Sequence, residues 1–172
     1  MIGLFVGRFQ PIHKGHIEVI KKLMNNVDEL IILIGSSQYS HVLENPFTAG
    51  ERISMIKLAL VEYGIDPGRC YIIPITDINM HRVWVAHVVT YTPSFDVVFT
   101  NEPLTSTLFK EAGFQVKPVP YFNRKKYSAT EVRNRMLKGE NWEELVPKSV
   151  VKFINQINGV ERLRELSKSD RI

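Results

Sequence analysis

The chain has 172 residues, of which 44% are apolar and 23% charged, a balance typical of a globular protein with a sizeable core. No stretch approaches the roughly 18–20 apolar residues that a membrane-spanning helix needs, and the N-terminus lacks the basic region and cleavage site of a signal peptide. Cys70 is the only cysteine, which excludes an internal disulfide. We therefore expect a cytoplasmic protein that does not enter a membrane.

The formal net charge of +4 is concentrated in one segment. Residues 124–138 contain six lysine and arginine residues and one acid, Glu131, so the segment carries +5 and the rest of the chain about −1. A concentrated basic patch suits a phosphate-bearing ligand or a nucleic acid, and a solvated helix face has the same composition.

Short apolar runs alternate with segments of helical periodicity as far as about residue 120. The runs predict five strands that are mostly apolar on both faces, at 2–7, 29–35, 70–75, 95–100 and 114–119. The first helical stripe consists of Ile17, Ile20, Leu23, Met24 and Val27, and the second of Ile53, Ile56, Leu60 and Tyr63. Thr48 and Glu51 have the spacing of a capping box, which predicts the start of the second helix.

After residue 120 the strand pattern stops and helical patterns follow, the first of them ending at Gly139. Pro147 is expected in the first turn of a later helix. The sequence predicts one domain over 1–172, with a sheet core at 1–120 and a helical C-terminal part at 121–172. The fold class is α/β: a doubly wound, Rossmann-like, parallel five-stranded sheet with helices on both faces and a helical tail. Ligands of such sheets bind at the carboxyl ends of the strands.

The loop after the first strand carries His13 and His16, three residues apart around Gly15. The helix expected near residue 14 has no Ser, Thr, Asp or Asn at its cap position, so its first N–H groups lack an obvious side-chain partner. A bound phosphate would satisfy them, and Gly15 would let the backbone approach the anion. A metal site would need further ligands at a recognisable spacing, and a core or surface role for the two histidines is the remaining alternative.

A second motif lies inside the basic segment, at the start of a predicted helix. Ser128 and Glu131 have capping-box spacing, and Thr130 and Arg133 add a hydroxyl and a guanidinium one turn into the helix. Such a helix start is suited to a polyphosphate, because its N–H groups and positive potential attract anions.

These two motifs carry a resemblance to a known family. His13-Lys-Gly-His16 resembles the (H/T)xGH signature of the nucleotidyltransferase α/β-phosphodiesterase superfamily, and Ser128-Ala-Thr130-Glu-Val-Arg133 resembles its second signature, ISSTxxR. Further stretches narrow the match: GRFQPxHxGH, GSSQYSH, NPFTAGER, DINMHRVW and INGVERL. Together they resemble the archaeal type of nicotinamide-mononucleotide adenylyltransferase over nearly the whole chain.

The resemblance implies that ATP and nicotinamide mononucleotide form NAD and pyrophosphate, by in-line attack on the α-phosphorus without a covalent intermediate. It assigns His16 to the α-phosphate, where positive charge matters most in the transition state, and places His13 beside it. Arg8, Ser128, Thr130 and Arg133 would hold the β- and γ-phosphates, and Mg²⁺ would enter with ATP, with no metal ligands from the protein. The resemblance adds further ATP contacts at Gly7, Phe9, Gly15, Thr100, Asn101 and Tyr127.

The predicted acceptor site follows the third strand. Trp84 would stack on the pyridinium ring, with a core position on an amphipathic helix as the alternative. Asp77 and Ile78 would meet the carboxamide, and His81 stands at the position from which the family contacts the nicotinamide amide. Arg52 is expected either to reach a phosphate or to form a surface ion pair.

The sequence departs from the family pattern at several positions. Tyr127 replaces the usual Ile and Ala129 a frequent Gly, while Thr100-Asn101-Glu102-Pro103 stands where the family often has S-G-N-P. His81 occupies a position that usually holds Asn.

Other functions share part of this pattern. The same chemistry on FMN or phosphopantetheine would use both signatures, and a nucleic-acid-binding module would use the basic segment but leave the first loop unexplained. A nucleotide sensor without catalysis would be expected to lose His16. We expect an enzyme that binds neither nucleic acid nor membranes, and the resemblance implies a homo-oligomer, in some relatives a hexamer.

Overall fold

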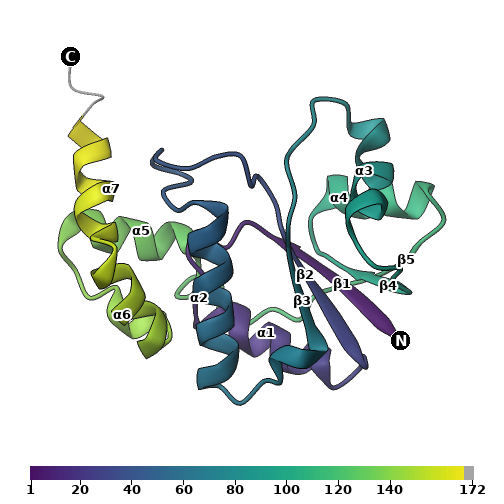
Figure 1. The fold of residues 1–172 in the computed structure, drawn as a ribbon, viewed down its shortest axis with the longest axis horizontal. Helices are drawn as coiled ribbons and strands as arrows, with labels where there is room; N and C mark the ends of the chain where they lie inside the picture. The colour runs from purple at the N-terminus through teal and green to yellow at the C-terminus, as the bar shows by residue number, and fades with distance from the viewer. Residues whose placement is uncertain (169–172) are drawn as a thin grey trace.

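The computed structural model describes residues 1–168 and contains one five-stranded, all-parallel sheet in the order β3-β2-β1-β4-β5 (Figure 1). The strands are β1 (Ile2–Gly7), β2 (Glu29–Ile34), β3 (Cys70–Pro74), β4 (Val97–Phe99) and β5 (Gln115–Lys117). All five predicted strands are present, although β4 and β5 are shorter than expected. Residues 169–172 of the predicted helical tail lie outside the described residues.

Helices cover both faces of the sheet, as the doubly wound fold predicts. One face carries α1 (Lys14–Met24) and α2 (Ala49–Glu62), and the other carries α3 (Trp84–Tyr91) and α4 (Pro103–Glu111) (Figure 1). Three short 3-10 turns lie at Pro67–Arg69, His81–Val83 and Glu143–Leu145.

The buried side chains form a separate cluster on each face, because consecutive residues of a strand point to opposite sides of the sheet. Phe5, Leu30 and Ile32 belong to the cluster beneath α1 and α2, whereas Leu4, Ile31 and Leu33 belong to the one beneath α3 and α4. The predicted stripe on α1 is fully buried against the first cluster. The two cores therefore explain the double-sided apolar runs of β1, β2 and β4, whereas the edge strands β3 and β5 are only partly buried.

The C-terminal helices α5 (Ala129–Lys138), α6 (Lys148–Gln156) and α7 (Gly159–Lys168) extend the first core (Figure 1). Gly139 ends α5 with a φ of 70°, and Pro147 is the N-cap of α6, one position before the predicted first turn. Arg162 of α7 forms a bidentate ion pair with Glu51 at 2.7 and 2.8 Å. Hydrogen bonding from Arg162 lowers the pKa of Glu51 to about 2.

The strand order reverses between β1 and β4, which pair in parallel at the centre of the sheet. In a doubly wound sheet this reversal opens a crevice at the carboxyl edge, between the loops that follow the two strands. No helix among residues 1–168 is long and apolar enough to cross a membrane.

Candidate active site

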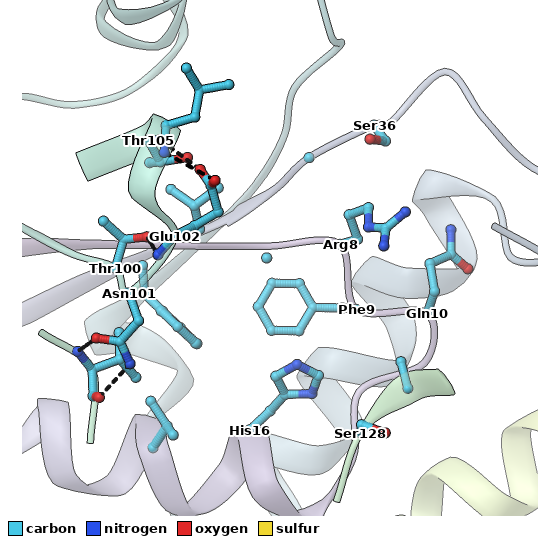
Figure 2. Close-up of a pocket in the computed structure, with 18 of the residues that line it drawn as sticks. Arg8, Phe9, Gln10, His16, Ser36, Thr100, Asn101, Glu102, Thr105 and Ser128 are labelled. Carbon is cyan, nitrogen blue, oxygen red and sulfur yellow. Dashed lines mark hydrogen bonds between the residues drawn. The ribbon is translucent and has the colours of Figure 1, made fainter. Parts of the chain in front are cut away.

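A cavity of about 1010 Å³ opens at this crevice. Both sequence motifs line it, as do the loops after β2, β3 and β4. In Figure 2 the ring of Phe9 lies at its centre, with Arg8 and Gln10 on one side, His16 below and Thr100 to Glu102 on the other side. The volume is at the upper end of the usual range for ligand sites, which suits two nucleotides better than one.

His13 and His16 cap the first helix themselves, which corrects the expectation of an uncapped helix. Nδ1 of His13 accepts a hydrogen bond from the backbone N–H of His16 at 3.3 Å, and Nδ1 of His16 accepts one from the backbone N–H of His13 at 3.2 Å. The pair is thus a capping box built from two imidazoles. The rings stack with centroids 3.6 Å apart.

Both imidazoles are neutral in the free protein, so neither histidine contributes a positive charge to the cavity. Burial lowers the pKa of His16 to about 3. Burial, with the neighbouring His16 as a second cause, also holds the pKa of His13 well below its usual value. Because each Nδ1 accepts a backbone N–H, the ring proton of each histidine resides on Nε2. His16 therefore offers the cavity a neutral N–H donor whose tautomer is fixed.

The second motif meets the first at the start of α5. Ser128 caps the helix by accepting the N–H of Glu131 at 3.1 Å, but the predicted capping box is incomplete, because the Glu131 carboxylate pairs with Arg135 at 2.9 Å instead. A Cβ on Gly15 would lie 2.9 Å from Cβ of Tyr127 and 3.0 Å from the His13 ring. Gly15 thus permits the two motifs to pack together.

Cationic side chains gather where the two motifs join. Arg8 and Arg133 line both the main cavity and an adjoining cavity of about 360 Å³, which Thr130 and Glu44 also line. Arg133 is buried and donates to the carbonyl of Gln10 at 2.9 Å. Burial lowers its pKa, and the charge of Arg8 lowers it further. Two neighbouring guanidinium groups that line the same cavity form a site that an anion would stabilise.

The loop after β4 forms the opposite wall of the cavity. The amide of Asn101 donates to the carbonyl of Val119 at 2.7 Å and accepts its N–H at 3.0 Å, so this side chain is already paired. The carboxylate of Glu102 caps α4 by accepting the N–H groups of Leu104 and Thr105 (Figure 2). Thr100 accepts the N–H of Glu102 at 3.0 Å. This wall can therefore bind a ligand through its backbone groups and through the hydroxyl proton of Thr100.

The predicted acceptor residues lie together at the carboxyl end of β3. Asp77, Ile78, His81 and Trp84 all line the cavity. Trp84 is half-buried at the start of α3, with its ring edge-to-face with Phe109 at 5.6 Å. The indole therefore contacts the core on one side and still contributes to the cavity wall.

Arg52 is the one predicted site residue outside the cavity wall. It is fully buried, so the surface ion pair considered from the sequence is wrong. Its guanidinium donates only to backbone carbonyls, which leaves it no donor for a phosphate.

Sequence reasoning missed two polar residues that shape the cavity. Gln10 is buried, and its amide pairs with both the carbonyl and the N–H of Phe47, at 3.0 and 2.9 Å. Ser36 binds the Asp77 carboxylate through its hydroxyl at 2.7 Å. Both residues lie within the quoted motifs GRFQPxHxGH and GSSQYSH, and their position after β1 and β2 was the signal that could have identified them.

Within the described residues, no group of three or more His, Cys, Asp or Glu side chains is placed to hold a metal ion. A divalent cation at this site would have to take most of its ligands from phosphate oxygens and water, an arrangement that suits Mg²⁺.

The fold and the two joined motifs define a nucleotidyltransferase, and the chain belongs to the cytidylyltransferase-like family, whose model matches residues 4–135. Three similar curated proteins are named nicotinamide-nucleotide adenylyltransferase. The Saccharolobus solfataricus protein is 53% identical over 98% of both chains, and the Archaeoglobus fulgidus protein 55% identical over 99% of both. The Pyrococcus horikoshii protein is 55% identical over 96% of this chain and 88% of its own. The family resemblance read from the motifs is confirmed.

A solved structure supports the fold. A bifunctional NMN adenylyltransferase/ADP ribose pyrophosphatase from Francisella tularensis, complexed with AMP and a Mn ion, superposes with a TM-score of 0.76 at 24% identity. The match covers 98% of this chain and 53% of that one, so the chain spans about half the length of that protein.

Proposed function

We propose that the protein is a nicotinamide-nucleotide adenylyltransferase that transfers AMP from ATP to nicotinamide mononucleotide. The phosphate oxygen of the mononucleotide forms a bond to the α-phosphorus of ATP, the α–β bridging bond breaks, and pyrophosphate leaves with that electron pair. The nucleophile is already anionic, so no protein nucleophile or strong base is required. The names of the similar archaeal proteins support this choice of acceptor.

The observation that carries the proposal is the meeting of the two motifs at one cavity. His16 is the neutral donor there, and Arg8 and Arg133 are the nearby cations. Oriented donors in a water-poor cavity stabilise charge that develops during transfer, and they act without reorganising. In this proposal the Nε2–H of His16 donates to an α-phosphate oxygen, and His13 holds the His16 backbone in place.

The polyphosphate end is assigned to the start of α5. Ser128 accepts the Glu131 N–H but keeps its own hydroxyl proton to donate to a phosphate oxygen, and the N-terminus of α5 adds its positive potential. Arg8, Thr130 and Arg133 complete this end, and Thr130 and Arg133 extend it into the smaller cavity.

We assign the ATP and acceptor ends of the cavity by the same reasoning. Phe9 and Gly7 form its floor beside the α-phosphate, while Thr100 and Asn101 face the adenosine, Asn101 through its backbone. Trp84 stacks on the pyridinium ring, and Ile78 and His81 face the carboxamide. Mg²⁺ enters with ATP and neutralises phosphate charge, held by phosphate oxygens and not by a protein cage.

We also propose that the whole chain forms one domain and works in the cytoplasm as a homo-oligomer. Exposed apolar side chains around α3 support self-association: Met80 is 63% exposed, Tyr91 60% and Val83 43%. Light scattering of the purified protein reports the oligomeric state directly.

One assay tests the central proposal: purified protein with ATP, Mg²⁺ and nicotinamide mononucleotide, followed by chromatography of the products. NAD and pyrophosphate in equal amounts are expected. Product with FMN or phosphopantetheine but none with nicotinamide mononucleotide would contradict the acceptor assignment while keeping the reaction class.

A further inference from the structure

Arg52 has an unusual set of partners for a buried cation. Its side chain is 0% exposed, and its five N–H groups meet five backbone carbonyls. Nε donates to Thr48 at 3.3 Å. Nη1 donates to Arg8 at 3.0 Å and to Gly35 at 2.9 Å. Nη2 donates to Ser36 at 3.1 Å and to Tyr39 at 3.3 Å.

Four of these carbonyls belong to two different loops of the active site, and the fifth, that of Thr48, belongs to the N-cap of α2. Arg8 lies in the loop after β1, which carries the first motif, and Gly35, Ser36 and Tyr39 lie in the loop after β2. Arg52 itself sits in the first turn of α2, outside both loops. A single side chain on a helix thus fixes the backbone of two loops relative to each other.

The contact network continues from the second loop to the acceptor end. The N–H and hydroxyl of Ser36 both donate to the Asp77 carboxylate, at 3.2 and 2.7 Å. Gln38 of the same loop accepts the N–H of Asp77 at 3.0 Å and donates to its carbonyl at 3.3 Å. Asp77 begins the loop that leads to Trp84. The path therefore runs from Arg8, at the phosphate end, through Arg52 and Ser36 to Asp77.

We propose that Arg52 is a positioning residue for adenylyl transfer, which sets the distance between the loop that holds the ATP phosphates and the loop that holds the acceptor. The inference rests on the proposed function. Arg52 does not touch either substrate, because its donors are all used within the protein. It acts by keeping Arg8 and Asp77 in fixed relative positions, so that the attacking oxygen lies in line with the α-phosphorus.

The guanidinium is required for this role. Its planar fork reaches carbonyls in several directions at once, whereas the ammonium of a lysine has three donors on one atom. A lysine at position 52 would leave at least two of the five carbonyls unpaired, although it would keep the charge. The two loops would then lose their common anchor while each binding subsite kept its own residues.

This role predicts that substitution of Arg52 lowers kcat but hardly changes KM. Each substrate meets intact ligands in Arg52→Lys, so the KM values for ATP and for nicotinamide mononucleotide should stay within about threefold of the wild-type values. Misplacement of the reacting groups by about 1 Å should lower kcat by about 100-fold.

A matched control is available at the opposite edge of the sheet. Arg69 precedes β3 and donates to the carbonyls of Asp28 at 2.7 Å, Val27 at 2.8 Å and Met24 at 3.3 Å. Arg69→Lys therefore removes the same kind of contact far from the cavity. It should lower thermal stability less than Arg52→Lys does, because only three carbonyls are involved and Arg69 is only half-buried, and it should leave kcat unchanged.

The experiment compares the wild-type protein, Arg52→Lys and Arg69→Lys by steady-state kinetics with both substrates and by hydrogen–deuterium exchange of the free proteins. Faster exchange in residues 35–39 and 77–79 is expected only in Arg52→Lys, together with the fall in kcat. Wild-type kcat and exchange in Arg52→Lys would overturn the inference. A raised KM for ATP with unchanged kcat would also overturn it, because that result would mean direct phosphate binding.

Failure of the proposed function and misfolding of Arg52→Lys would each have a distinct outcome. If the wild-type protein forms no NAD, the proposed function fails, and the exchange data alone decide whether Arg52 couples the two loops. If Arg52→Lys does not fold, the double variant Ser36→Ala/Gln38→Ala removes three of the four hydrogen bonds between the second loop and Asp77. It should lower kcat with little change in either KM, and unchanged kcat would then reject the path.

Discussion

The backbone N–H groups of His13 and His16 each donate to the other residue's imidazole Nδ1, at 3.2 and 3.3 Å. The two side chains therefore begin helix α1 and, at the same time, fix each other's tautomer. Because Nδ1 of each ring is used to cap the helix, the ring proton is held on Nε2, the nitrogen left to donate to a ligand.

His16→Ala should lower kcat by roughly 100- to 1000-fold, the usual effect of removing one oriented donor to developing charge. Binding of ATP should survive in large part, since Arg8 and Arg133 remain. Steady-state kinetics and calorimetric titration with ATP measure the two effects. His41→Asn is the control, because His41 is exposed and outside the cavity wall. Near-normal turnover of His16→Ala would remove His16 from the mechanism.

Stability should fall as pH decreases from about 6.5, the usual pKa of an unfolded histidine, toward 3. The folded chain keeps His13 and His16 neutral at pKa values below the usual one, so the unfolded chain binds more protons in this range. The contribution of the two neutral histidines to stability is complete above pH 6.5. A second loss, from Glu51, sets in only below its usual pKa of 4.5.

Urea unfolding at pH 8, 6 and 5 measures this effect. His13→Asn keeps a side-chain cap but removes one titrating ring, so its free energy of unfolding should depend less on pH, by at most about 1.4 kcal/mol per pH unit. Equal slopes for the two proteins would show that His13 does not titrate between the folded and unfolded states.

Gly15→Ala should separate the two motifs, because the new methyl group would lie 2.9 Å from Cβ of Tyr127. Raised KM for ATP and lowered kcat are expected together. Gly50→Ala is a matched substitution in the first turn of α2, where the nearest atom lies 4.0 Å from the new Cβ. Steady-state kinetics give kcat and the KM for ATP of both variants. Equal values in the two would mean that the motifs tolerate a wider spacing.

Trp84→Ala should raise the KM for nicotinamide mononucleotide by roughly 5- to 30-fold, which corresponds to the loss of about 1–2 kcal/mol of stacking on a cationic ring. Trp84→Phe should recover most of the affinity, and the KM for ATP should not change in either variant. A change in the KM for ATP alone would place the indole at the wrong end of the cavity.

The sequence was sufficient to predict the sheet, because both-face apolar runs and helical stripes report on burial directly. It also located the cavity, since every predicted site residue except Arg52 lines it. The capping role of the histidines was missed, because imidazole is not among the usual cap residues. Contacts such as those of Arg52 depend on carbonyl directions in distant loops, which a one-dimensional pattern does not contain.

Two side-chain amides stand in for peptide groups beside the cavity: Gln10 against Phe47, and Asn101 against Val119. Each uses one donor and one acceptor, a pairing that only an amide provides. Deamidation, a slow chemical change in ageing or heated protein, would convert the donor into a carboxylate oxygen facing a carbonyl. Loss of activity on prolonged heating would then begin with the loss of these two amide contacts, before the core unfolds.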